Sequence, residues 1–237
     1  SFFLTAPFFG IRGVPSMVKL ALGFMVAVFL FPGIPLAQPE FGDSWVYVLA
    51  VVKESLAGLT LGFLANLIFS AIQVAGQLLD LHMGLAMSSF FDPQNATNTT
   101  VVGRFFVILG LLLFFQMDGH HTLLLALQAS FKHLSLGGVY FDAGIIWATV
   151  KLFGAMFNLA LRIASPVITI LLVSDLALSL VARTVPQLNV FILGFPLKVG
   201  LGMLTLIAIL PLLGTVFANL FSQMEQDLAL LLRTWLP

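Results

Sequence analysis

The side chains best able to do chemistry gather at Asp118-Gly119-His120-His121, where a carboxylate precedes two imidazoles. Aspartate and histidine bind metal ions and act as general acids and bases. The spacing, however, matches no HExxH or related zinc motif. A polar helix break, in which these groups satisfy freed backbone atoms, explains the same residues. We therefore interpret the cluster as a helix break, with a metal or acid–base site as the alternative.

Two further pairs of ionisable residues lie within apolar runs. Asp80 with His82 suggests a proton relay, and Lys53-Glu54 suggests an ion pair for transport. Residues one or two positions apart do not face each other on a helix, so structural roles are favoured for both pairs. The sequence contains no cysteine, Gly-rich phosphate loop, Ser-His-Asp set or paired-carboxylate motif. We predict that the chain is not an enzyme and holds no cofactor or metal.

The elements that position these residues are those of a membrane protein. Of 237 residues, 60% are hydrophobic and 8% charged, and the net charge is zero. A soluble domain carries about 25% charged residues, and disorder requires low hydrophobicity. No basic patch for nucleic acid is visible. The composition predicts an all-α integral membrane protein that contacts lipid.

The longest stretch without proline runs from Trp45 to Phe91 and would extend about 70 Å as a helix, more than twice a bilayer span. Gly58 and Gly62 form a GxxxG motif, which permits close helix approach. Polar residues then recur at steps of 4, 3, 4 and 3, which places Asn66, Ser70, Gln73, Gln77 and Asp80 on one helix face. Such a polar stripe is costly against lipid, so it faces other helices or a water-filled space.

The other segments also predict helices with polar or proline interruptions. Ser1–Phe9 is interpreted as the end of a helix whose start is missing, and 17–36 as one bilayer span. The runs 104–117 and 122–131 predict a kinked helix or helical hairpin. The last two long helices are expected over 143–185, interrupted only by Pro166, and over 197–232.

The helix expected over 143–185 carries a second polar stripe. Asn158, Arg162, Ser165 and Thr169 follow at steps of 4, 3 and 4, so they share a face turned away from lipid. Three functional classes are compatible with helices of this kind: a subunit of a channel or export gate, a secondary transporter, and an intramembrane enzyme. Buried polar stripes on helices longer than a bilayer favour the first, because such stripes need partners. A transporter would more often show inverted repeats and an enzyme needs a catalytic constellation, and neither is found in the sequence.

Several motifs resemble the FliR/SctT family of type III export-gate proteins. They are His82-Met83-Gly84-Leu85-Ala86, Phe90-Phe91-Asp92-Pro93, Asp118-Gly119-His120, Pro186-Gln187-Leu188-Asn189-Val190-Phe191 and Gly194-Phe195-Pro196-Leu197-Lys198. The Pro-Gln-x-Asn-x-Phe part is shared with injectisome relatives, whereas the Gly-Phe-Pro-Leu-Lys continuation is more typical of flagellar proteins. The similarity covers essentially the whole chain in the expected order.

The resemblance implies a non-enzymatic gate subunit that forms, with several copies of FliP and FliQ and with FlhB at the base, the channel for unfolded flagellar proteins. It implies a FliP-like part over 1–137, lacking its first helix, fused into one domain with a FliQ-like helical hairpin over 138–237. The location would be the bacterial inner membrane and flagellar basal body, with much of the gate raised toward the periplasm. An injectisome gate subunit and, less favoured, a secondary transporter are the alternatives.

By the same resemblance, residues 83–99 form a plug that projects into the pore. The residues assigned to it are Met83, Gly84, Met87, Phe90, Phe91, Asp92 and Pro93. The first polar stripe would face partner subunits or the lumen. Subunit packing is expected from Asp118, Gly119, His120, Pro186, Gln187, Asn189, Phe191, Gly194, Phe195, Pro196 and Lys198.

Overall fold

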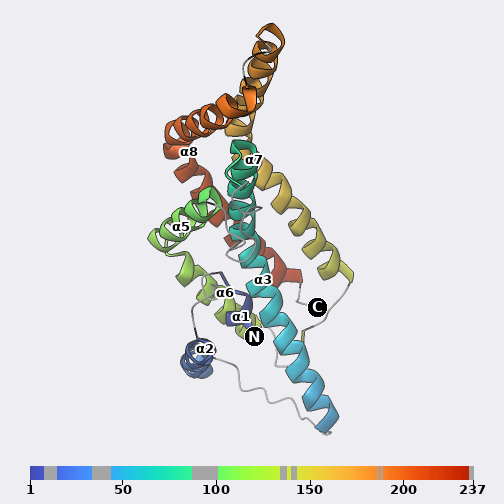
Figure 1. Cartoon of the computed structure of the whole chain (residues 1–237). Helices are drawn as coiled ribbons and strands as arrows, with labels where there is room; N and C mark the ends of the chain where they lie inside the picture. The colour runs from blue at the N-terminus through green and yellow to red at the C-terminus, as the bar shows by residue number, and fades with distance from the viewer. Residues whose placement is uncertain are drawn as a thin grey trace. The chain divides into compact units, whose positions relative to one another are not determined.

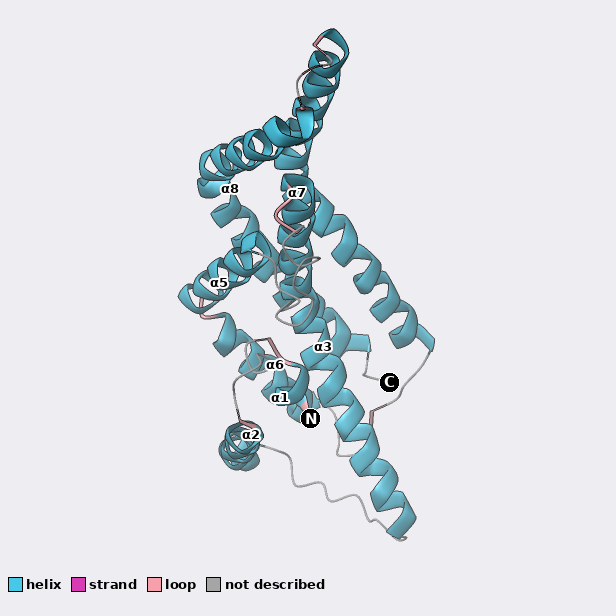
Figure 2. Cartoon of the chain, in the orientation of Figure 1, coloured by secondary structure: helices cyan, strands magenta, loops and turns pink. Residues whose placement is uncertain are grey.

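A computed structural model describes residues 1–7, 15–33, 44–86, 101–133, 138–139, 143–185, 187 and 189–234. Every regular element in these ranges is a helix (Figures 1 and 2), which confirms the all-α fold. The order is α1 (Phe2–Thr5), α2 (Ser16–Leu30), η1 (Phe31–Gly33), α3 (Ser44–Met83), α5 (Val101–Gln116), α6 (Gly119–His133), α7 (Ala143–Thr184) and α8 (Val190–Thr234). The division of the chain into a FliP-like part and a FliQ-like part stays a prediction.

The three longest helices each exceed what a bilayer requires. Helices α3, α7 and α8 contain 40, 42 and 45 residues, whereas about 20 residues cross the hydrocarbon. Within the described residues these three helices are long and apolar enough to span a membrane. The bent pair α5 and α6 makes a fourth span if it crosses as one unit. The prediction of helices longer than a simple span is confirmed.

The apolar run from Met17 forms the 15-residue α2 and continues into η1, and the end of the predicted span, 34–36, lies outside the described residues. Two other predicted boundaries are wrong. Helix α3 ends at Met83, because Gly84 adopts the left-handed conformation (φ 82°) that suits a helix C-terminus. Helix α8 begins at Val190, so Pro196 lies within it and marks no break.

The polar interruption between α5 and α6 is a sharp bend of 68°, as the kinked-helix prediction expected. Asp118 occupies the left-handed region (φ 55°) at the bend. Its N–H donates to the carbonyl of Phe115, and its own carbonyl accepts the N–H groups of His121 and Thr122. The bend is therefore a backbone turn that ends one helix and starts the next.

The chain divides into two compact units. The first comprises Ser1–Phe69, Phe114–Gly154 and Leu220–Pro237. Here α1 packs on the GxxxG motif of α3: the Thr5 hydroxyl donates to the Leu59 carbonyl at 3.1 Å, and a Cβ on Gly62 would lie 2.7 Å from the Phe2 carbonyl oxygen. Phe69, Phe114 and Phe221 form an aromatic cluster with ring centroids 5.3–5.6 Å apart, which joins three helices.

The second unit comprises Ser70–Leu113 and Ala155–Asn219. In this unit the backbones of α3 and α5 approach each other closely. A Cβ on Gly76 would lie 2.4 Å from the Cα of Gly103, a distance at which no side chain fits. The buried rings of Phe106 and Phe217 meet edge to face at 6.0 Å and hold α5 to α8.

The Gly76 contact predicts the effect of adding one methyl group. Gly76→Ala forces α5 away from α3, and we expect destabilisation of roughly 1–3 kcal/mol, typical of overpacking. Gly200→Ala on α8 is the matched control, because no atom lies within 4 Å of its added Cβ and alanine favours helix by up to about 1 kcal/mol. Thermal unfolding of both variants in detergent measures the difference. Equal melting temperatures would show that the close approach of Gly76 is absent.

Candidate functional site at the end of α3

Asp80 lies at the centre of the site and is fully buried, with 0% of its surface exposed. Its Oδ1 accepts the Val102 N–H at 3.1 Å, and its Oδ2 accepts the Gly103 N–H at 3.0 Å. These two N–H groups belong to the first turn of α5, where no intrahelical acceptor is available. Asp80 therefore caps α5 from another helix, and its negative charge complements the positive end of the helix dipole.

The backbone carbonyl of Asp80 makes a second attachment. It accepts the N–H of Ala86 at 3.2 Å, while the N–H of Gly84 donates to Leu81 at 3.1 Å. These bonds close the chain back on the last turn of α3 after the left-handed Gly84. Asp80 therefore binds Ala86, which precedes the segment 87–100, and also Val102, which follows it.

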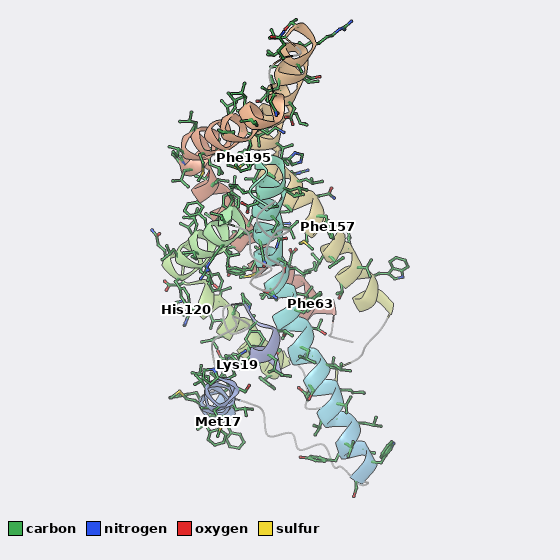
Figure 3. The ribbon with its side chains drawn as sticks, viewed as in Figure 1. Met17, Lys19, Phe63, His120, Phe157 and Phe195 are labelled. Carbon is green, nitrogen blue, oxygen red and sulfur yellow. The ribbon has the colours of Figure 1, made fainter. Side chains whose placement is uncertain are left out.

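The two residues around the end of α3 contact α8. A Cβ on Gly202 would lie 2.7–2.8 Å from Met83 side-chain atoms, so the fully buried Met83 packs directly on the Gly202 backbone. A Cβ on Gly84 would lie 3.0 Å from the ring of Phe195. Figure 3 labels Phe195 on α8 beside the C-terminal end of α3. The structure therefore brings together two motifs that lie over a hundred residues apart in the sequence.

An ion pair joins α7 to α8 next to these contacts. Lys198 Nζ lies 2.5 Å from Asp175 Oδ1, with 27% and 40% of the two side chains exposed. On the same side of α8, a Cβ on Gly194 would lie 3.3 Å from Leu178 of α7. The helix itself starts from Asn189, whose side-chain oxygen accepts the Ile192 N–H at 3.3 Å. The motif from Asn189 to Lys198 thus starts α8 and holds it to α7.

The amides of the first polar stripe differ in burial from its carboxylate. Asn66, Ser70, Gln73 and Gln77 are half-buried, whereas Asp80 is completely covered. The stripe therefore lies at the edge of the packed surface of α3 and ends in the buried cap of α5. The orientation of its amides toward partner subunits or the lumen stays a prediction.

The cluster first considered for chemistry serves the bend between α5 and α6. A Cβ on Gly119 would lie 2.3 Å from the Phe114 ring, so this position accepts only glycine. The His120 ring stacks near Phe115 with centroids 5.4 Å apart, and its buried Nδ1 has no hydrogen-bond partner among the described residues. Within those residues, no group of three or more metal-ligating side chains is found.

Several predicted site residues lie outside the described residues. These are Met87, Phe90, Phe91, Asp92, Pro93 and Pro186. Of Phe191 only the helical backbone is described, and Gln187 lies exposed in a turn before α8.

Sequence reasoning missed the residues that make the contacts of the site possible. Gly76, Gly103 and Gly202 stand where backbones or a buried methionine approach closely. Val102 and Gly103 supply only N–H groups, which carry no side-chain pattern. The sequence offered one indication of this packing. Gly76 lies one helical turn before Asp80 on the same face of α3, where a glycine permits another helix to approach closely.

The cap predicts a graded effect of substitution at Asp80. Asp80→Ala leaves two buried N–H groups unpaired and should lower the free energy of unfolding by roughly 2–4 kcal/mol. Asp80→Asn retains one acceptor and should lose less. Glu225→Gln, at an exposed position on α8, is the control and should unfold as the wild type does. Chemical denaturation in detergent measures all three, and an Asp80→Ala variant as stable as the control would contradict the cap.

Comparison with known proteins agrees with the motifs assembled at this site. The family model for bacterial export proteins, family 1, matches residues 1–224. Proteins named "Flagellar biosynthetic protein FliR" are similar over most of their length, at 36% identity in Bacillus subtilis (strain 168), covering 94% of this chain and 86% of the relative. The sequence identity is 38% to the protein of this name from Pectobacterium carotovorum subsp. carotovorum and 36% to that from Escherichia coli (strain K12). Each of these two alignments covers 95% of this chain and 86% of the relative.

These relatives are named as flagellar biosynthetic proteins and not as enzymes. The match extends across both compact units, and the helices long enough to span a membrane fit an export protein of the bacterial inner membrane. The chain belongs to the bacterial export proteins of family 1, the family of the flagellar biosynthetic FliR proteins.

Proposed function

We propose that the chain is a structural subunit of the flagellar type III export gate. In this proposal it forms, with several copies of FliP and FliQ and with FlhB, the channel through which unfolded flagellar proteins leave the cell. The role is structural and involves no catalysis. Family membership and the flagellar names of the relatives support this reading over an injectisome gate subunit.

The observation that carries the proposal is the mismatch between the helices and a bilayer. Helices α3, α7 and α8 are each about twice as long as a span, and all three leave large apolar side chains exposed. Lipid covers at most about 30 Å of such a helix. The remaining apolar surface requires other protein chains.

A half-buried amide on α3 is consistent with the same conclusion. Gln73 exposes part of its polar group within an apolar stretch of the helix, and a partner helix satisfies such a group better than lipid does. A secondary transporter acting alone would leave the excess helix length without a covering surface.

The proposed location is the flagellar basal body, with part of the gate raised out of the bilayer plane toward the periplasm. That position accounts for helices that exceed the membrane thickness. The assignment of residues 83–99 as the pore plug belongs to this proposal. It is supported by the family resemblance, and Asp80 binds the chain on both sides of 87–100.

Native mass spectrometry of the purified assembly tests the proposal. The chain is co-expressed with FliP and FliQ from the same bacterium and isolated by a tag on this chain alone. We expect one complex that contains this chain and multiple copies of both others, because the apolar faces require partners. The chain expressed alone is the control. Recovery of the co-expressed chain only as a monomer or as a homo-oligomer would contradict the proposal.

A further inference from the structure

The second polar stripe of the sequence lies on an uncovered face of α7. Asn158, Arg162, Ser165 and Thr169 are all exposed, and they fall within an arc of about 60° on the helix. The opposite face, with Ala160, Ala164 and Val167, is completely buried in the second unit. The stripe therefore faces away from the packed interior of this chain.

Arg162 is the residue that most needs a partner. It lies inside Trp147–Thr184, a segment long and apolar enough to cross a membrane. No carboxylate in the described part of the chain forms an ion pair with its guanidinium. An unpaired guanidinium on an apolar helix is expensive unless a carboxylate, a phosphate or water receives it.

The form of the stripe distinguishes among these three partners. Polar residues extend about 17 Å along the helix from Asn158 to Thr169, too far for one layer of lipid headgroups to reach. The line is also narrow, with exposed Leu161, Leu172 and Val173 at its sides. A water-filled lumen requires a broader polar surface, whereas a narrow polar seam between apolar flanks is typical of packed membrane helices.

The hydroxyl groups indicate which polar groups the partner carries. Ser165 donates to the carbonyl of Arg162 at 3.0 Å, and Thr169 donates to that of Ser165 at 2.8 Å. Since their protons are used within α7, both oxygens are left to accept. A matching helix presents a carboxylate to Arg162 and, one or two turns away, an amide or hydroxyl donor to Ser165 or Thr169.

We propose that this face of α7 is a docking surface for an apolar helix of another chain that carries a carboxylate opposite Arg162. The inference deepens the proposed function by naming the chemistry of one subunit interface. The two proposals can fail separately. If the chain assembles with its partners but the tests below give the contrary result, the gate role stands and only this interface is refuted.

Photo-crosslinking in the intact assembly tests the surface directly. A photoreactive benzoylphenylalanine replaces Asn158 or Thr169 on the stripe, or Ile170 on the neighbouring flank as the control. We expect protein adducts at 158 and 169 with a yield at least five times that at 170. Adducts with lipid alone, or protein adducts no more frequent than at 170, would overturn the proposal.

Substitution of Arg162 tests the carboxylate. Arg162→Gln should lower the fraction of chain in the native complex at least tenfold, whereas Arg162→Lys keeps the charge and should lose less. Lys151→Gln, which removes an exposed cation from the same helix, is the matched control and should assemble normally. Assembly of Arg162→Gln at the wild-type level would refute the ion pair. If that variant fails to accumulate, the crosslinking yields, measured with Arg162 present, decide.

The absence of cysteine allows a clean measurement of water access. Thr169→Cys provides a single thiol, which a water-soluble maleimide should label in the separated chain and leave unlabelled in the assembled complex. Equal labelling in both states would mean that the stripe lines an aqueous channel, and the docking surface would then be rejected.

Discussion

The carboxylate of Asp80 is the constraint on which the arrangement around the end of α3 depends. Its two oxygens take up the free N–H groups of Val102 and Gly103, and its carbonyl takes up that of Ala86. A buried carboxylate requires such partners, and the first turn of a helix requires such acceptors. Each group therefore satisfies the other, and the start of α5 is fixed beside the end of α3.

Glycine and methionine adapt the neighbouring surfaces to this constraint. Gly76 lets the backbones of α3 and α5 approach closely enough for the cap to form, and Gly84 turns the chain immediately after Asp80. The buried Met83 packs directly on Gly202 of α8, and its unbranched side chain adapts readily to such a close contact. The Lys198–Asp175 pair then connects α8 to α7. Local chemistry at one helix end is thereby linked to the longest helices of the unit.

The sequence predicted features that depend on local pattern. The all-α fold, the long helices and the bend at Asp118-Gly119 follow from apolar runs and from residues that break helices. The end of α3 was missed because a single glycine in an apolar run carries little information by itself. The early start of α8 was missed because Pro196 suggested a break, although long membrane helices tolerate proline. The partners of Asp80 were beyond prediction, since backbone N–H groups occur at nearly every residue.

Amide hydrogen exchange at Val102 and Gly103 tests the cap on α5, because it reports on the two bonds that Asp80 makes. The first N–H groups of an ordinary helix exchange rapidly, since they lack intrahelical acceptors. The cap predicts that both amides are protected to the degree seen in the middle of α5, and that Asp80→Ala abolishes this protection while the Phe106 amide keeps its own. Rapid exchange of the Val102 and Gly103 amides in the wild-type chain would contradict the capping of α5 by Asp80.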